Sequence, residues 1–159
     1  MIDKQSYIAR ISNATPLQLL VISYDMFLDS LGQAKKTIDT EDFSKNLEFM
    51  EKVLIEIIGS LNLEMELAKE VLPLYVNVQR LMGQAQAKAI RKGQKDGVLK
   101  LLDDAEQIMT ILLDGIKQLE EVDAPAMDNS QQIYAGLTYQ KGGVLKEFIS
   151  EDSSKSFKA

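Results

Sequence analysis

The chain has no cysteine and no histidine among its 159 residues, and these two absences exclude several kinds of chemistry. Without cysteine there is no disulfide framework and no thiolate to act as a nucleophile or metal ligand. Without histidine there is no Ser-His or Cys-His pair and no histidine-containing zinc site. Enzymes that depend on these pairs or on histidine-containing zinc sites are therefore excluded.

The sequence also lacks a long hydrophobic run and an excess of positive charge. Charged or polar residues interrupt every apolar stretch well before the ~20 residues that cross a bilayer. Residues 1–7 contain no basic region followed by an apolar run, so they do not look like a signal peptide. The net charge of −6 repels a phosphate backbone. We therefore expect a cytosolic protein that neither inserts into membranes nor binds nucleic acid.

What the chain does contain is aliphatic side chains at helical spacing. Hydrophobic residues make up 45% of the sequence and aromatic residues only 6%, which is typical of a single helical domain. A first helix is expected at 16–39, because Thr15 can cap it, Pro16 suits its first position and Gln18 completes a capping box. Apolar residues recur along one side of this helix at gaps of three and four: Leu17, Leu20, Tyr24, Phe27, Leu31, Ala34 and Ile38.

Three further segments repeat this spacing and predict helices at about 41–62, 70–92 and 97–121. The helix at 70–92 should begin near Lys69 or Glu70, because a proline such as Pro73 fits the first turn but costs ~3 kcal/mol deeper inside. Since the connections are short or moderate, neighbouring helices should be antiparallel. The predicted fold is all-α, an up-down-up-down four-helix bundle within residues 1–122.

A short arm precedes the predicted bundle. Residues 1–12 are mostly polar but include Tyr7, Ile8 and Ile11, which would share one face of a short helix. Two or three helical turns are marginal alone, so the arm must dock on the bundle to be ordered.

An irregular tail, residues 123–159, follows the predicted bundle. Its proline, glycines and serines break any helical period, and residues 150–159 are expected to be disordered. Residues 133–139 are too apolar for a pure linker. They either pack against the bundle or serve as a short docking peptide.

Two features of the predicted helices admit both a packing and a binding interpretation. In the second helix, Phe49, Val53 and Ile58 widen the apolar stripe, either because the helix touches two neighbours or because one flank is open to a partner. Four helical glycines cost ~1 kcal/mol each relative to alanine. These glycines are Gly32, Gly59, Gly83 and Gly115. We expect neighbouring helices to approach closely at these positions. The alternative is that the missing side chains leave a shallow groove, and Gly83 is the best candidate for it.

No cluster of acidic residues predicts a catalytic or metal site. A di-iron bundle needs inward-facing glutamates and Glu-x-x-His pairs, whereas Glu48, Glu51, Glu56 and Glu106 fall away from the apolar seams. We therefore expect no catalytic residue, no metal and no cofactor. The protein should act through its surface and not as an enzyme, and helix-in-groove recognition is the mode that suits a helical bundle.

Two motifs resemble the flagellar secretion chaperone FliS family. Ala14-Thr15-Pro16, followed by Leu19-Leu20 and Tyr24-Asp25, is similar to the start of that family's first long helix, where a Thr-Ala-Ser/Thr-Pro cap precedes Tyr-Asp-Gly. Residues 74–85 align without gaps to the family's third-helix pattern Leu-Tyr-Asp-x-Met-x-Arg-Arg-Leu-x-x-Ala. The resemblance covers roughly residues 7–121.

The sequence departs from the family pattern at several positions. In the third helix Tyr75, Arg80 and Ala85 match, but Val76 replaces the usual Asp and Leu81 the usual Arg. Met26 replaces the Gly after Tyr-Asp, and the usual Trp of the last helix is absent. These differences bear on which client is bound.

The resemblance implies a cytosolic export chaperone. Such a protein binds the C-terminal helical segment of flagellin in an apolar groove between helices, prevents premature polymerisation and delivers flagellin to the flagellar export apparatus. The export gate and an anti-sigma factor are further partners that it suggests. The residues expected to bind the partner are Tyr7, Ile11, Tyr24, Ile58, Tyr75, Val78 and Met82.

Alternatives remain open at this point. Tyr7 and Ile11 either occupy the groove before the client arrives or merely close one end of the bundle. One alternative function is that of another bundle-type flagellar chaperone or regulator with a different client, such as a hook-associated protein. The other is that of a structural bundle that forms a homodimer.

Overall fold

The computed structural model describes residues 4–121, and within them the fold consists of five α-helices and no strands. A short α1 (Lys4–Ser12) is followed by four longer helices: α2 (Pro16–Lys36), α3 (Asp42–Gly59), α4 (Glu66–Ala89) and α5 (Lys95–Glu121). The all-helical prediction is confirmed. The predicted tail at 123–159 lies outside the described residues.

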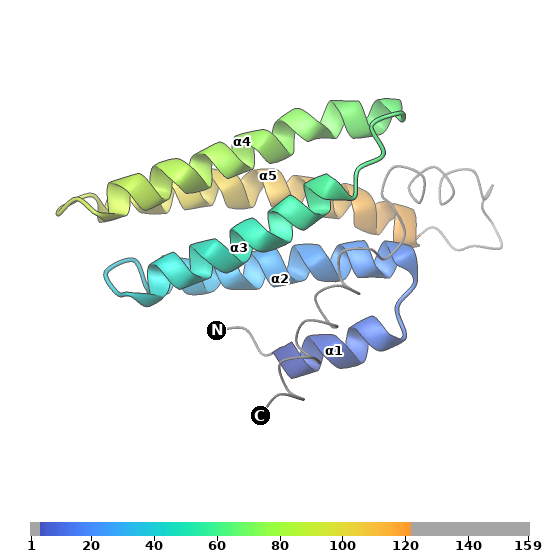
Figure 1. The fold of residues 1–159 in the computed structure, drawn as a ribbon, viewed down its shortest axis with the longest axis horizontal. Helices are drawn as coiled ribbons and strands as arrows, with labels where there is room; N and C mark the ends of the chain where they lie inside the picture. The colour runs from blue at the N-terminus through green and yellow to red at the C-terminus, as the bar shows by residue number, and fades with distance from the viewer. Residues whose placement is uncertain (1–3, 122–159) are drawn as a thin grey trace.

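The four longer helices lie side by side, and successive helices run in opposite directions (Figure 1). α2 packs against α3 and α5, and α4 packs against the same two helices. This arrangement is consistent with the antiparallel bundle that the sequence predicts. None of the described helices is both long and apolar enough to cross a membrane.

A capping box fixes the start of α2. The Thr15 hydroxyl oxygen accepts a hydrogen bond from the Gln18 backbone N–H at 3.2 Å, and the Gln18 side-chain oxygen accepts one from the Thr15 N–H at 2.9 Å. Pro16 occupies the first helical position, where no partner for an N–H is needed. Backbone groups that a helix start leaves unpaired are thus satisfied locally, without help from α1.

The core runs along the centre of the four longer helices. The Tyr24 side chain of α2 and the Tyr75 side chain of α4 meet there, with ring centroids 6.4 Å apart and a hydrogen bond between their hydroxyl groups. The large side chains that are fully buried come from all four helices: Tyr24, Phe27, Leu31, Met50, Leu54, Ile57, Tyr75, Val78, Val98, Leu102 and Met109.

α4 begins earlier than the sequence predicts, which corrects the expected start near Lys69 or Glu70. The helix starts at Glu66, so Pro73 lies inside it and removes one backbone hydrogen bond. The earlier start places Ala68 in the core with no exposed surface, and Val71 packs against the same core. Apolar burial by Ala68, Val71 and Leu72 in the first two turns offsets part of the local penalty of the proline.

The expectation that helices approach closely at the helical glycines is wrong. A Cβ atom built on Gly32, Gly59, Gly83 or Gly115 meets no other group within 4 Å. Gly93 is different, because its φ of +78° lies in the left-handed region that favours glycine, at the turn between α4 and α5. Among the glycines of residues 4–121, Gly93 alone is therefore required by the backbone.

Lys35 connects α2 to α5. Its Nζ lies 2.6 Å from an Asp103 carboxylate oxygen and 2.7 Å from a Glu106 carboxylate oxygen. Burial alone lowers the pKa of Lys35, but the hydrogen bonds with these two carboxylates raise it more, so the pKa lies above its ordinary value. The ammonium group is thus stabilised in its charged form.

Candidate functional site

The short helix α1 folds back along α2. Tyr7 contacts Asp29 and Arg10 contacts Asp25, so residues later in α1 meet residues earlier in α2 and the two helices are antiparallel. Residues 13–15 form the tight connection, in which the Ala14 N–H donates to the Ile11 carbonyl at 3.2 Å. Figure 1 shows α1 beside α2 and α3, on the side of the bundle away from α4.

α1 covers an apolar surface that is separate from the main core. Tyr7 is 6% exposed and packs with Ile22 and Met26, which are each 2% exposed. Ile11, Ala14, Leu19 and Phe49 surround these three. The residues beneath the arm, Leu19, Ile22 and Met26 of α2 and Phe49 of α3, are called the arm-covered surface below. Phe49 also packs against the main core, so it joins the two clusters.

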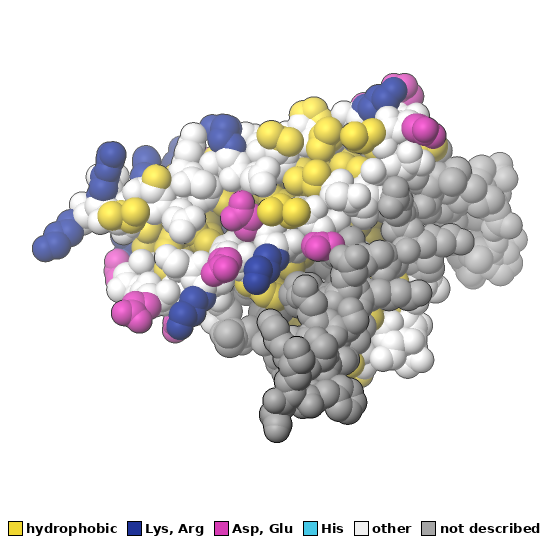
Figure 2. Space-filling view, viewed as in Figure 1, with side chains coloured by type: hydrophobic (Ala, Val, Ile, Leu, Met, Phe, Trp, Pro, Cys, Tyr) yellow, Lys and Arg dark blue, Asp and Glu magenta, His cyan; other side chains and the backbone are white. Residues whose placement is uncertain are grey.

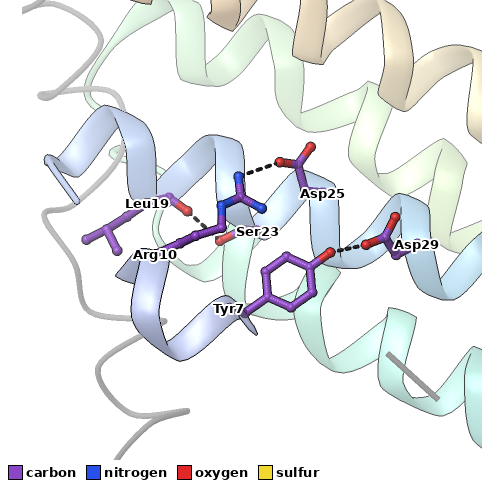
Figure 3. A network of polar contacts seen from close by, with 6 residues as sticks. All are labelled: Tyr7, Arg10, Leu19, Ser23, Asp25 and Asp29. Atoms are coloured by element: carbon purple, nitrogen blue, oxygen red, sulfur yellow. Dashed lines mark hydrogen bonds and ion pairs between the residues drawn. The ribbon is translucent and has the colours of Figure 1, made fainter. Parts of the chain in front are cut away.

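Polar contacts border this surface on one side (Figure 3). The Tyr7 hydroxyl donates a hydrogen bond to the Asp29 carboxylate, and an Arg10 guanidinium nitrogen lies 2.8 Å from an Asp25 carboxylate oxygen. The Arg10 guanidinium carbon also lies 5.5 Å from the centre of the Tyr7 ring. Burial raises the pKa of the Tyr7 hydroxyl, and the bond to Asp29 raises it further, so the group stays a neutral donor.

The energy that holds α1 in place is modest. The Arg10 and Asp25 side chains are 47% and 28% exposed, and ion pairs of that kind contribute ~0.2–1 kcal/mol. A helix of nine residues has little stability of its own. Docking of the arm therefore depends mainly on the Tyr7 ring and its apolar neighbours.

The structure does not bring the seven predicted partner-binding residues together. Tyr7 and Ile11 lie in the arm, over the arm-covered surface. Ile58 is half-buried at the edge of the main core. The remaining four lie in that core, where Met82 is 4% exposed and the other three have no exposed surface: Tyr24, Tyr75, Val78 and Met82.

The four core residues therefore do not line an open groove in this conformation, which corrects that expectation. An apolar seam at helical spacing marks the face that a helix buries, and here that face meets the neighbouring helices. The sequence reasoning missed Leu19, Ile22 and Met26 as site residues. Their spacing of three and four predicts a second apolar stripe on α2, and this signal could have identified them.

The arm-covered surface can bind apolar side chains of another helix, with carboxylates beside it to accept hydrogen bonds. Asp25 and Asp29 lie one helical turn apart on α2, next to Ile22 and Met26. Within residues 4–121 no group of three or more acidic, histidine or cysteine side chains is placed to hold a metal ion. The geometry is that of a binding surface.

Comparison with known protein families identifies a family for this chain. The family model described as flagellar protein FliS matches residues 3–118, which is well over half of the chain. The matched region begins before α1 and ends within the last turn of α5, so it includes the arm and leaves out residues 119–159. No curated protein and no solved structure matches the chain.

Proposed function

Because this chain belongs to the FliS family of flagellar chaperones, we propose that it is a cytosolic export chaperone for flagellin. In this proposal it binds the C-terminal helical segment of flagellin, keeps it from polymerising in the cytosol and delivers it to the export apparatus. The family is one of chaperones and not of enzymes, so the activity is one of binding and release.

The observation that carries the proposal is the arm-covered surface. Ile22 and Met26 are closed off from water by α1, a short helix that contributes nothing to the main core. Tyr7 and Ile11, one helical turn apart, are the kind of apolar pair that an amphipathic client helix presents. A client helix can therefore take the place of α1 and make the same contacts over a greater length.

Replacement of the arm by the client also accounts for reversible binding. A client segment that folds on binding gives up ~2–5 kcal/mol to ordering. The client must in addition displace α1. Its apparent affinity is therefore the intrinsic affinity multiplied by the small fraction of molecules in which the arm is already open. Both terms weaken the complex, which favours release at the export apparatus.

The side chains beside the arm-covered surface give the client a chemical requirement. Asp25 accepts a charged donor and Asp29 a hydroxyl donor from α1. A client helix that offers lysine, arginine or a hydroxyl side chain beside its apolar stripe will satisfy both carboxylates. An acidic client helix will leave them unpaired and repelled, which disfavours binding.

Binding to purified flagellin tests the proposal directly. We expect isothermal titration calorimetry to show a complex with full-length flagellin and none with flagellin that lacks its C-terminal segment. Binding that persists after this deletion would contradict the proposed client segment. Absence of binding to any flagellin, together with a stable dimer in light scattering, would favour the structural homodimer instead.

A further inference from the structure

A band of α4 is apolar around its whole circumference. The run Val71-Leu72-Pro73-Leu74-Tyr75-Val76 contains no charged side chain, its one polar group is the Tyr75 hydroxyl, and only Tyr75 in it is fully buried. Leu74 is 41% exposed and Val76 50% exposed, while Pro73 is also exposed. A helix that is hydrophobic all round is normally buried on every side, so this band, residues 71–76, lacks a cover among the described residues.

Other exposed hydrophobic side chains lie in the same half of the bundle. Ile55 of α3 is 50% exposed, Leu63 in the connection to α4 is 52% exposed, and Ile111 of α5 is 62% exposed. Figure 2 shows hydrophobic side chains gathered over the right-hand half of α4. At the opposite end of the bundle, the described residues include one large hydrophobic side chain that is more than 40% exposed, that of Ile90 at the end of α4. The uncovered apolar surface is therefore concentrated at one end.

The chain leaves the bundle at that same end. α3 and α5 run in the same direction, so α5 ends beside the α3–α4 connection (Figure 1). Val76 lies ten residues into α4 from Glu66, which is about 15 Å along the axis. Since α4 packs directly on α5, with packed helix axes ~8–10 Å apart, the band lies about 20 Å from the last residue of α5.

The sequence after α5 supplies a segment that fits the band. Residues 133–139, Ile-Tyr-Ala-Gly-Leu-Thr-Tyr, contain no charged residue, and five of the seven are hydrophobic. The eleven residues at 122–132 separate this segment from α5, and a random-coil chain of eleven residues has an end-to-end distance of roughly 18 Å on average. The linker therefore matches the distance to the band.

We propose that residues 133–139 fold back and cover the apolar band of α4 in the same molecule. A segment tethered by a short linker is present at an effective concentration on the order of millimolar, far above that of a second copy in a micromolar solution. The intramolecular contact therefore wins over dimerisation through this band. The family match ends at residue 118, so this cover is a feature of the chain beyond the region that defines the family.

The absence of cysteine makes a direct test simple. A single Val76→Cys substitution in the full chain gives one site for a nitroxide spin label, and Ile90→Cys gives a matched control at the other end of α4, where the native side chain is 83% exposed. NMR peak intensities of residues 133–139 are then measured with each label. We expect these peaks to lose intensity with the label at position 76 and to keep it with the label at position 90.

Three outcomes would overturn the proposal. The first is an equal peak intensity for residues 133–139 with both labels. The second is a loss of peak intensity confined to residues 144–149, which would show that a different part of the tail contacts the band. The third is a loss that appears when spin-labelled and isotope-labelled chains are separate molecules in one mixture, which would identify a second copy as the occupant. As a further check, Ile133→Ser with Leu137→Ser in the Val76→Cys chain should restore the peaks. No flagellin is present, so this result is independent of the client.

Discussion

Removal of the Tyr7 ring should make client binding tighter. Tyr7 is 6% exposed, packs on Ile22 and Met26, and donates a hydrogen bond to Asp29. Truncating a buried large aromatic residue to alanine in a core costs ~3–5 kcal/mol. Because Tyr7 lies on a peripheral helix, we expect Tyr7→Ala to weaken docking of the arm by about 2–3 kcal/mol, at or below the lower end of that range.

The effect on affinity follows from competition between the arm and the client. Each 1.4 kcal/mol removed from arm docking raises the apparent affinity about tenfold, until the arm is open in most molecules. Tyr7→Ala should therefore lower the dissociation constant by up to ~30–150-fold, the full value being reached only if the arm is still closed in most molecules of the variant. Fluorescence anisotropy with a labelled peptide from the C-terminal segment of flagellin measures this change, and circular dichroism checks that the bundle remains folded.

Two companion variants separate the arm's roles. Tyr7→Phe keeps the ring and removes only the hydroxyl group, so it should tighten binding ~2–10-fold. Ile8→Ala changes a neighbouring residue of the same helix that is 38% exposed, and it should leave the affinity unchanged. Unchanged or weaker binding by Tyr7→Ala, with Ile8→Ala as the reference, would refute displacement of the arm and leave α1 as a cap on the bundle.

Three further predictions concern stability, each measured as the free energy of unfolding in urea. Gly83→Ala should stabilise the protein by ~0.5–1 kcal/mol because the added Cβ meets open space, whereas Gly93→Ala should destabilise it because φ there is +78°. Lys35→Met should cost ~1 kcal/mol, and Lys45→Met, which removes a pair whose side chains are both 68% exposed, should change nothing measurable. The pKa of Lys35 is raised by folding, so its stabilisation should be complete below its unfolded pKa of ~10.4 and be lost as the pH rises beyond the folded value. If Lys35→Met had no effect on the free energy of unfolding between pH 5 and pH 7, the argument about Lys35 would be contradicted. If Gly83→Ala unfolded at a lower free energy than the parent chain, the argument about Gly83 would be contradicted.

The fold could be predicted well because its signals are local. Thr15, Pro16 and Gln18 mark the start of α2 by backbone chemistry alone, and regular spacing marks the buried face of each longer helix. The start of α4 could not be predicted in this way. The penalty of Pro73 is visible in the sequence, but the burial of Ala68, Val71 and Leu72 that offsets part of it depends on neighbours from other helices.

The candidate site was harder to predict for a related reason. Periodicity shows that a helix face is apolar without showing what covers that face. The sequence pattern places Tyr24 and Tyr75 on apolar helix faces, and these two residues meet each other in the core, whereas Ile22 and Met26 lie under the arm. α2 carries two apolar stripes, and only the packing reveals that one meets the neighbouring long helices and the other meets the short helix α1.

The capping box at the start of α2 has a consequence for how the arm moves. Thr15 and Gln18 satisfy each other's backbone groups, so the first turn of α2 stays intact whether or not α1 is attached. In the proposed exchange, undocking of the arm would therefore need rotation only at residues 13–14, and no helical turn of α2 would have to unwind. A client would then replace the arm while the four longer helices keep their packing.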